Sequence, residues 1–193
     1  MLNVLLVRPG STKFDEEGRI KGALNIPLSP LGEQQSIAAS ENLRDMPVAR
    51  LYVAPCDSAQ ATGKILASHC GWKSRTIECF RNVNQGLWQG KLIDEVRRLQ
   101  PRVYKQFQDN PIGICPPGGE MLDAALNRVE AMVDKLVRRH KHGTVGLVIP
   151  EPLASVVRCH LLGCDVSDVW TSQMDAGTWE LLTLHQPLAA SNP

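Results

Sequence analysis

The sequence predicts an α/β fold, a three-layer sandwich in which a mostly parallel sheet is flanked by helices. Short apolar runs alternate with helical patterns along the chain, and strands that alternate with helices form parallel sheets. The first run, Leu2–Val7, is apolar at most positions and stops abruptly at Arg8-Pro9-Gly10-Ser11-Thr12. Such a run is typical of a strand buried on both faces, and the loop after it is where these sheets place ligands.

The next elements continue the alternation. Residues 13–29 are rich in charge, glycine and proline, without a sustained period, so we expect a loop over the strand end. Ser29-Pro30 offers an N-cap residue and a proline at the first helical position, which predicts a helix to about Arg44. Leu51–Ala54 is predicted to be a second buried strand, and a helix follows from about Ser58 to Ser68.

The second half contains an irregular segment and the clearest helix. Residues 80–119 show one amphipathic stretch, at roughly Leu92–Phe107, and we interpret the segment as a cap-like insertion over the strand ends. Apolar residues recur in steps of three and four from Leu122 to Leu136, which predicts a helix ending before Gly143. The remaining predicted elements are short strands at Thr76–Cys79, Val145–Ile149 and Thr178–His185, a helix at Pro152–Leu162, and a frayed tail over 186–193.

The composition is typical of a single domain, here residues 1–193. Apolar residues make up 43% of the chain and charged residues 21%, as in ordinary globular proteins. The formal net charge is +1, and the basic cluster Arg138–His142 is interpreted as a solvated helix C-terminus rather than a nucleic-acid surface. No run approaches the ~18 apolar residues of a membrane span, and no signal-peptide pattern is present. We therefore expect neither a nucleic-acid partner nor a membrane association.

The six cysteines have no paired spacing of the C-x-x-C kind. Cys159 and Cys164 are the nearest pair and have no zinc signature. The cysteines are most simply reduced, buried thiols. We therefore expect a cytoplasmic protein that holds no metal and no cofactor.

Five segments, in order, resemble the motifs of one family. Arg8-Pro9-Gly10-Ser11-Thr12 stands where that family has Arg-His-Gly-Glu-Thr. The other four are Glu17–Gly22 with Ile26–Gln34, Tyr52–Thr62, Arg81–Gly90 and Leu147–Pro152. They are similar to Gly-Arg-x-Gln-Gly with Pro-Leu-(Ser/Thr)-x-x-Gly-x-Gln, to Ser-Ser-Pro-Leu-x-Arg-Ala, to Arg-Glu-x-x-x-Gly-x-Trp-Glu-Gly and to Val-Val-Ser-His-Gly. The chain thus resembles the histidine phosphatase (phosphoglycerate mutase-like) superfamily along nearly its whole length.

The resemblance implies phosphoryl transfer through a phosphohistidine. In the family an imidazole attacks phosphorus, two arginines, a second histidine and an asparagine hold the oxygens, and a carboxylic acid protonates the leaving group. Here Arg8 keeps the first arginine, while the other matched positions are changed. They carry Pro9 for the nucleophile, Ser58 for the second arginine, Asp15 for the asparagine, Glu151 for the second histidine and Asn82 for the acid.

These changes predict a degenerate catalytic site. Proline nitrogen is a tertiary amide with no lone pair to attack phosphorus, and an amide side chain cannot act as a general acid. We expect Arg8, Asp15, Ser58 and Glu151 to line a ligand site of unknown ligand. We also expect Arg8 to form a salt bridge with Glu151 or Asp15, because a phosphate dianion beside two carboxylates is repelled by several kcal/mol even at an effective dielectric of about 20.

The sequence leaves three alternatives open. Ser11, Thr12, Cys56 or Ser58 could replace the nucleophile, with Glu151 as the only candidate base. Asp15 and Glu151 could hold Mg²⁺ or Mn²⁺, although an ion-pair cluster is the simpler interpretation. Trp88 is interpreted as a structural residue, with a ligand-stacking platform as the alternative.

The sequence supports three functional hypotheses. The leading one is an inactive histidine-phosphatase-like protein with a binding or regulatory role. The second is a phosphomonoesterase or phosphoglycerate-mutase-type enzyme that acts through non-standard residues. The third is a structural partner that joins an active relative or a second copy of this chain, which predicts a sizeable apolar surface patch.

Overall fold

The chain forms one five-stranded sheet. The structure is a computed structural model, and it describes residues 1–165 and 174–184. The strands lie in the order β3-β2-β4-β1-β5, and every neighbouring pair is parallel except β1 with β5. Their bounds are β1 Leu2–Val7, β2 Val48–Val53, β3 Ser74–Thr76, β4 Gly143–Val148 and β5 Trp179–Leu184. The predicted mostly parallel sheet is confirmed.

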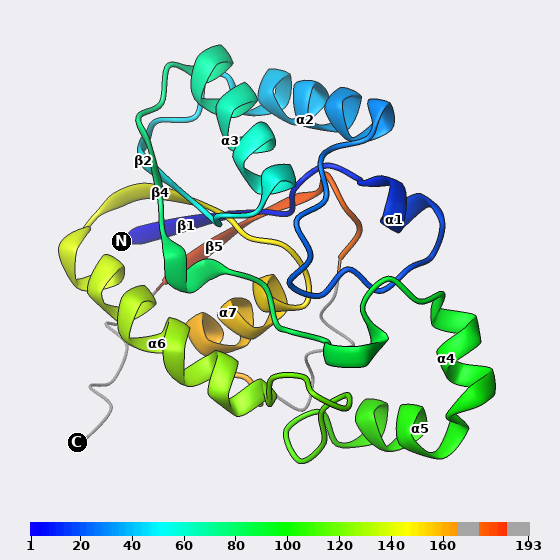
Figure 1. Cartoon of the computed structure of the whole chain (residues 1–193). Helices are drawn as coiled ribbons and strands as arrows, with labels where there is room; N and C mark the ends of the chain where they lie inside the picture. Colours follow the sequence, from blue (N-terminus) through cyan, green and yellow to red (C-terminus); the bar gives the residue numbers. More distant parts are fainter. Residues whose placement is uncertain (166–173, 185–193) are drawn as a thin grey trace.

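Helices cover both faces of this sheet. On one face lie α2 (Pro30–Leu43) and α3 (Asp57–Cys70), and on the other lie α6 (Leu122–Arg139) and α7 (Leu153–Leu162), as Figure 1 shows. Because both faces are covered, the central strands are apolar at almost every position rather than at alternate ones. Five of the six residues of β1 are buried. This is the predicted three-layer sandwich.

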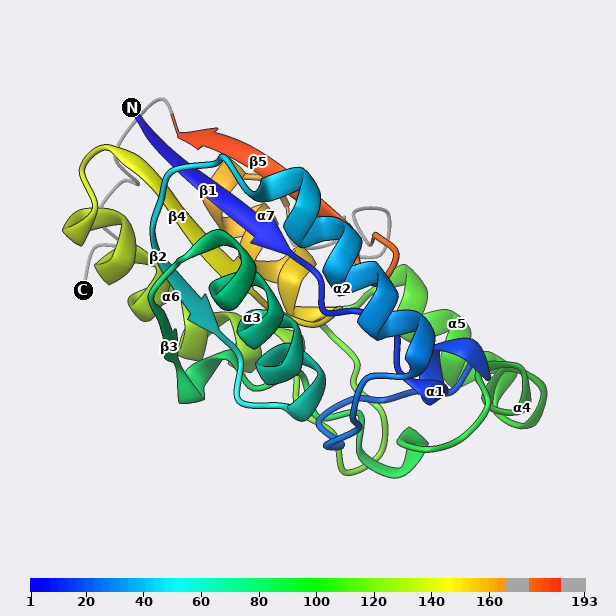
Figure 2. The ribbon, with the colours of Figure 1, turned by 90° about the horizontal axis from the view of Figure 1, so that it is seen from above.

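A third group of elements lies beyond the end toward which β1 points (Figure 2). It contains α1 (Lys13–Glu16), α4 (Ile93–Leu99) and α5 (Pro101–Asp109). The last two belong to residues 80–119, which we call the cap segment. Two short 3₁₀ helices, Glu78–Phe80 and Gly86–Trp88, lead from the sheet into it.

Three local predictions were wrong. Residues 13–29 are not all loop, because Thr12 and Asp15 form a capping box that starts α1. The single stretch at 92–107 is two helices, since Gln100 precedes Pro101 and leaves the helical region, with φ −131° and ψ 53°. The third strand is Ser74–Thr76 rather than Thr76–Cys79, because its partner β2 ends at Val53, opposite Thr76.

The other predictions concern the main helices, the thiols, the tail and a membrane span. The helices expected near 30–44, 58–68, 122–136 and 152–162 are present, with ends shifted by a few residues at most. All six cysteines lie in the described ranges and none is in a disulfide. Cys159 is buried, Cys164 is exposed and the other four are half-buried, so the expectation of buried thiols was wrong for most. The predicted tail at 186–193 lies outside the described residues. Within the described ranges, no helix is both long and apolar enough to cross a bilayer.

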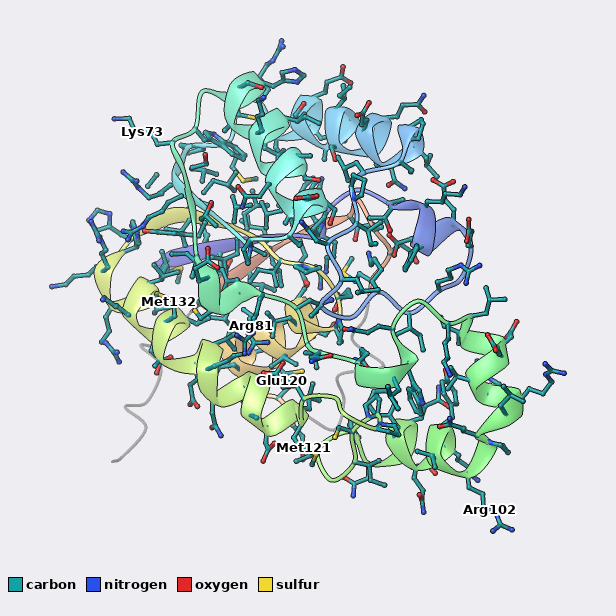
Figure 3. All side chains as sticks on the ribbon, viewed as in Figure 1. Lys73, Arg81, Arg102, Glu120, Met121 and Met132 are labelled. Atoms are coloured by element: carbon teal, nitrogen blue, oxygen red, sulfur yellow. The ribbon has the colours of Figure 1, made fainter. Side chains whose placement is uncertain are left out.

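An ion pair at the start of α6 holds the chain that leads into the cap segment. Arg128 donates from Nε and Nη2 to the two carboxylate oxygens of Glu120, at 2.7 and 3.0 Å. Its guanidinium also donates to the carbonyl oxygens of Cys79 and Asn82. Arg81 approaches the same carboxylate at 4.0 Å, and Figure 3 shows Arg81 beside Glu120. Burial raises the pKa of Glu120, but the hydrogen bonds and charge of Arg128 outweigh it, so the net pKa is lowered.

We predict that Glu120→Gln destabilises the protein at neutral pH by about 2 kcal/mol, because a charged hydrogen-bonded partner of Arg128 is lost. A depressed folded-state pKa stabilises the fold above the unfolded-state pKa, and this contribution disappears as the pH falls through the folded-state value. The difference in unfolding free energy between wild type and variant should therefore narrow below about pH 4. Denaturant unfolding from pH 7 to pH 3 measures it.

Asp94→Asn is the matched control for this experiment. Asp94 pairs with Arg97 at 3.2 Å, but its side chain is 90% exposed. Exposed pairs contribute little to stability, so this variant should unfold like wild type at every pH. A difference for Glu120→Gln that stays constant with pH would contradict the prediction.

Candidate functional site

The carboxyl ends of β1 and β4 and the first residues of β5 lie side by side at one end of the strands. Val7 pairs with Val148 on one side and with Trp179 on the other. The residues that follow β1 and β4 are therefore neighbours of the residues that begin β5. A cavity of about 360 Å³ opens between this edge and the cap segment. Its walls include Arg8, Pro9, Asp15, Arg19, Lys21, Gln85, Trp88, Tyr104, Phe107, Pro150, Glu151 and Pro152.

Arg8 is the central charged residue of this wall, although it is only 1% exposed. Its Nε donates to Glu151 Oε1 at 2.9 Å, and its Nη1 donates to Glu180 Oε1 at 2.6 Å. The other oxygen of Glu180 accepts from Arg158 Nε at 3.0 Å. The predicted salt bridge from Arg8 to Glu151 is confirmed, and Glu180 is a second partner that the sequence did not indicate.

Glu151 is held by hydrogen bonds to its side-chain carboxylate and to its backbone carbonyl. Its Oε2 accepts from the backbone N–H of Ser155 at 3.0 Å, which caps the first turn of α7. Its backbone carbonyl accepts from Asn82 Nδ2 at 2.8 Å. Glu151 therefore joins the N-terminus of α7, the buried Arg8 and the chain that enters the cap segment.

Asp15 faces a different cation. Its Oδ2 accepts from the backbone N–H and from the hydroxyl of Thr12, at 2.7 and 2.8 Å. Its Oδ1 lies 2.7 Å from Lys21 Nζ. Asp15 is thus a helix-capping residue with its own lysine, and of the two partners expected for Arg8 only Glu151 is used. With Asp15 on Lys21 and Glu151 on Arg8, ion pairing describes these carboxylates better than a metal site.

Ser58 and Asn82 lie outside the main cavity. Both line a neighbouring cavity of about 170 Å³, which shares Lys21, Gly22 and Pro150 with the first. Asn82 is 4% exposed and uses its whole amide group. It donates to the carbonyls of Gly22 and Glu151, and it accepts from the backbone N–H groups of Val83 and Leu153. The structure therefore divides the predicted site residues between two cavities.

The candidate replacement nucleophiles have no base beside them in the main cavity. Among the described residues, Ser11, Thr12, Cys56 and Ser58 are absent from its walls. The Thr12 hydroxyl does contact a carboxylate, but Thr12 is fully buried and serves the α1 cap. Ser58 approaches Cys56 Sγ at 3.7 Å. None of these four side chains has a hydrogen bond to Glu151 in the described part of the chain.

No histidine in the described ranges lines either cavity. His69 bonds Ser40, and His140 Nε2 lies 2.8 Å from the hydroxyl of Tyr52. Burial, together with Arg139 and Arg50, lowers the pKa of His140. His160 lies at the α6–α7 interface with Asp134 and Glu130, the only group of three or more His, Cys, Asp or Glu side chains in the described residues that is close enough for a metal ion.

The cap segment contributes an aromatic wall. Trp88 is 1% exposed, and its indole N–H donates to Gln100 Oε1 at 3.0 Å. Tyr104 packs tilted against it with ring centroids 5.9 Å apart, and Phe107 packs edge-on at 5.4 Å. Trp88 is thus a packed structural residue and also a wall of the cavity. Sequence reasoning missed the two α5 residues, whose amphipathic spacing was the available signal.

Comparison with known proteins matches the chain to one family over nearly its whole length. A sequence model of the histidine phosphatase superfamily (branch 1) matches residues 4–188. Phosphoserine phosphatase 1 of Hydrogenobacter thermophilus is 24% identical over 186 residues, covering 96% of this chain and 88% of the relative. A probable phosphoglycerate mutase, GpmB of Salmonella choleraesuis, is 26% identical over 198 residues, covering 95% of this chain and 92% of its own.

A solved structure agrees at the level of the fold. The mycobacterial glucosyl-3-phosphoglycerate phosphatase Rv2419c, in complex with VO3, superposes with a TM-score of 0.86 at 23% identity, covering 94% of this chain and 90% of the other. The family match extends over all the described strands and helices except the first residues of β1. The chain therefore belongs to the histidine phosphatase superfamily, branch 1.

Proposed function

We propose that this chain is an inactive member of its superfamily, in which phosphohistidine chemistry has been lost and a binding or regulatory role remains. The observation that carries the proposal is the pairing of the Arg8 guanidinium with two carboxylates of the protein. A phosphoryl-binding arginine must offer free donors to the substrate. Here two carboxylates, Glu151 and Glu180, already accept from it at 2.9 and 2.6 Å.

The nucleophile position supports the same conclusion. Pro9 lines the cavity next to Arg8, where the family resemblance places the attacking histidine. A proline ring offers phosphorus no lone pair. No described residue of the cavity wall is a histidine, cysteine or serine. The covalent intermediate of the family has no atom on which to form.

The remaining positions have taken structural roles. The Asn82 amide is consumed by four backbone groups, and as an amide it cannot protonate a leaving group. Ser58 supplies no positive charge. At an effective dielectric of about 20, a phosphate dianion about 5 Å from the Glu151 carboxylate is repelled by several kcal/mol. Positioning and charge stabilisation, which phosphoryl transfer depends on, are both weakened.

A second candidate is a phosphomonoesterase or mutase that uses non-standard residues. The names of the relatives favour it, since they include a phosphoserine phosphatase and a probable phosphoglycerate mutase. Binding of a protein partner or of a second copy of this chain stays a prediction. A cytoplasmic location also stays a prediction. The assays below separate the two candidate functions.

We expect no turnover of p-nitrophenyl phosphate, phosphoserine or 3-phosphoglycerate by the wild-type protein above that of Pro9→Ala. Neither form has a nucleophile at position 9, so their rates should be equal. Phosphate release measures the rate, with the Hydrogenobacter phosphatase as the active reference. Wild-type turnover clearly above Pro9→Ala would instead establish the second candidate.

Restoring the nucleophile alone should not restore activity. In Pro9→His the new imidazole would still face the Arg8–Glu151 pair, without a second cation at Ser58 and without an acid at Asn82. We expect phosphate release and phosphoenzyme formation, followed by mass spectrometry, to stay at the Pro9→Ala level. Robust activity of the single variant would show that the other matched positions have been misassigned.

Freeing Arg8 should create the anion site that the wild type lacks. Removing both carboxylates, in Glu151→Gln with Glu180→Gln, leaves a buried unpaired charge and costs about 3–5 kcal/mol. Phosphate at ten times its dissociation constant would recover about 1.4 kcal/mol, or roughly 3 °C in Tm. The wild type should show no such shift with phosphate or vanadate.

Asp94→Asn is the control, because Asp94 pairs with Arg97 at 3.2 Å and neither residue lines the cavity. Thermal unfolding with and without 10 mM phosphate compares the three proteins, and the single variant Glu151→Gln should lie between the double variant and wild type. An equal increase of Tm with phosphate in wild type and double variant would contradict the proposal that Glu151 and Glu180 keep phosphate from Arg8.

A further inference from the structure

We infer that the main cavity is a binding site for an uncharged small molecule that carries an aromatic ring and an amide-type hydrogen-bonding group. The inference rests on the proposed function, since it takes the cavity as released from phosphoryl chemistry. Three independent features of the wall carry it: an amide that faces the cavity without a partner among the described residues, an aromatic face, and cations that already have carboxylate partners.

The unpartnered amide belongs to Gln85. This residue is 6% exposed and lines the cavity. Its backbone bonds to Gln89 and Trp88, but its side chain makes no hydrogen bond to any described residue. The neighbouring Gln89 differs, because its Oε1 accepts from Ala23 N at 2.7 Å and from Gln85 N at 3.2 Å.

The fully buried side-chain polar atoms without a partner in the described residues are Arg8 Nη2 and Ser155 Oγ, so the Gln85 carboxamide is accessible from the cavity and can bond to its contents. Since Gln85 lines an open cavity, the missing partner can come from a molecule inside it. A carboxamide offers one acceptor and two donors. The complementary ligand is therefore a group that both accepts and donates, such as another amide or a lactam, rather than a group that only accepts.

The aromatic face stands in the same cavity as Gln85. Trp88 is held by Gln100 and by two ring contacts, so its position is fixed before any ligand arrives. Tyr104 and Phe107 are only half-buried, and α5 has no fully buried residue. The accessible part of Tyr104, which also has Arg97 5.3 Å from its ring centroid, offers apolar surface for a planar group. A cavity of about 360 Å³ is large enough for a substituted ring.

The charges of the wall argue against an anionic ligand. Arg8 is held by two carboxylates, Lys21 lies 2.7 Å from Asp15, and Arg19 lies 2.6 Å from Glu17. Every cation that the described residues place on this wall thus has its own carboxylate. The remaining amino group of Arg8, Nη2, has no hydrogen-bond partner among the described residues, but it exposes less than 1 Å² and so does not reach the cavity surface. An entering anion would lose its hydration without meeting a free cation, whereas an uncharged ligand loses less.

The test compares two probes of similar size, benzamide and phenyl phosphate. Titration of the full chain, followed by calorimetry and by the NMR signals of the Gln85 carboxamide and the Trp88 indole, measures both affinities. We expect benzamide to bind and to shift both signals, with phenyl phosphate at least tenfold weaker. Tighter binding of phenyl phosphate, or no binding of benzamide to the wild type, would overturn the inference.

Variants of the wall locate the site. Gln85→Leu keeps the size of the side chain and removes its hydrogen bonds, so benzamide should bind about tenfold more weakly. Gln106→Leu is the matched control, because Gln106 is exposed on α5 and is absent from the cavity wall. Tyr104→Leu tests the aromatic face independently and should weaken benzamide several-fold. Unchanged affinity in both Gln85→Leu and Tyr104→Leu would place benzamide elsewhere and contradict the site.

The two proposals fail in different measurements. If the wild type hydrolyses phosphomonoesters, the proposed function fails, whatever benzamide does. If it does not hydrolyse them and phenyl phosphate still binds more tightly than benzamide, the proposed function survives and the inference about the ligand is wrong.

Discussion

The guanidinium of Arg8 lies almost fully buried between the carboxylates of Glu151 and Glu180, and the rest of the site depends on this arrangement. A buried cation is very costly without partners. Its two partners come from different elements, one from the loop after β4 and one from the antiparallel β5. The same contacts therefore neutralise Arg8, tie the edge strand β5 to α7 through Arg158, and anchor the start of α7.

This closed ion pair changes what the cavity can hold. In a phosphoryl-transfer site, preorganised cations wait for an anion, and their attraction is strongest where water is excluded. Here the corresponding charge is already satisfied by the protein. The family's sequence pattern is retained over residues 4–188. In the cavity at the carboxyl ends of β1 and β4, the paired charges favour an uncharged ligand. Structural likeness and catalytic competence thus rest on different residues, as they do in many folds.

The cap segment is attached firmly where it leaves the sheet. Arg128 binds Glu120 and two carbonyls of the entering chain, and Asn82 joins that chain to Glu151 and Gly22. The position matched to the family's acid has therefore become a connector between the cap segment and the β4 edge. The free carboxamide of Gln85 lies three residues later, so it is presented to the cavity on a well-supported piece of backbone.

Local patterns in the sequence determined the buried strands, the starts of the main helices and the place of Arg8 and Pro9 after β1. These features depend on residues within a turn or two of one another, so a single chain segment contains the signal. Tertiary structure alone decided that Glu180 would face Arg8, that Asp15 would turn to Lys21, and that Ser58 and Asn82 would leave the main cavity. Those choices follow from strand register and packing between residues as far as 172 positions apart, and no local pattern encodes them because the competing partners are chemically alike.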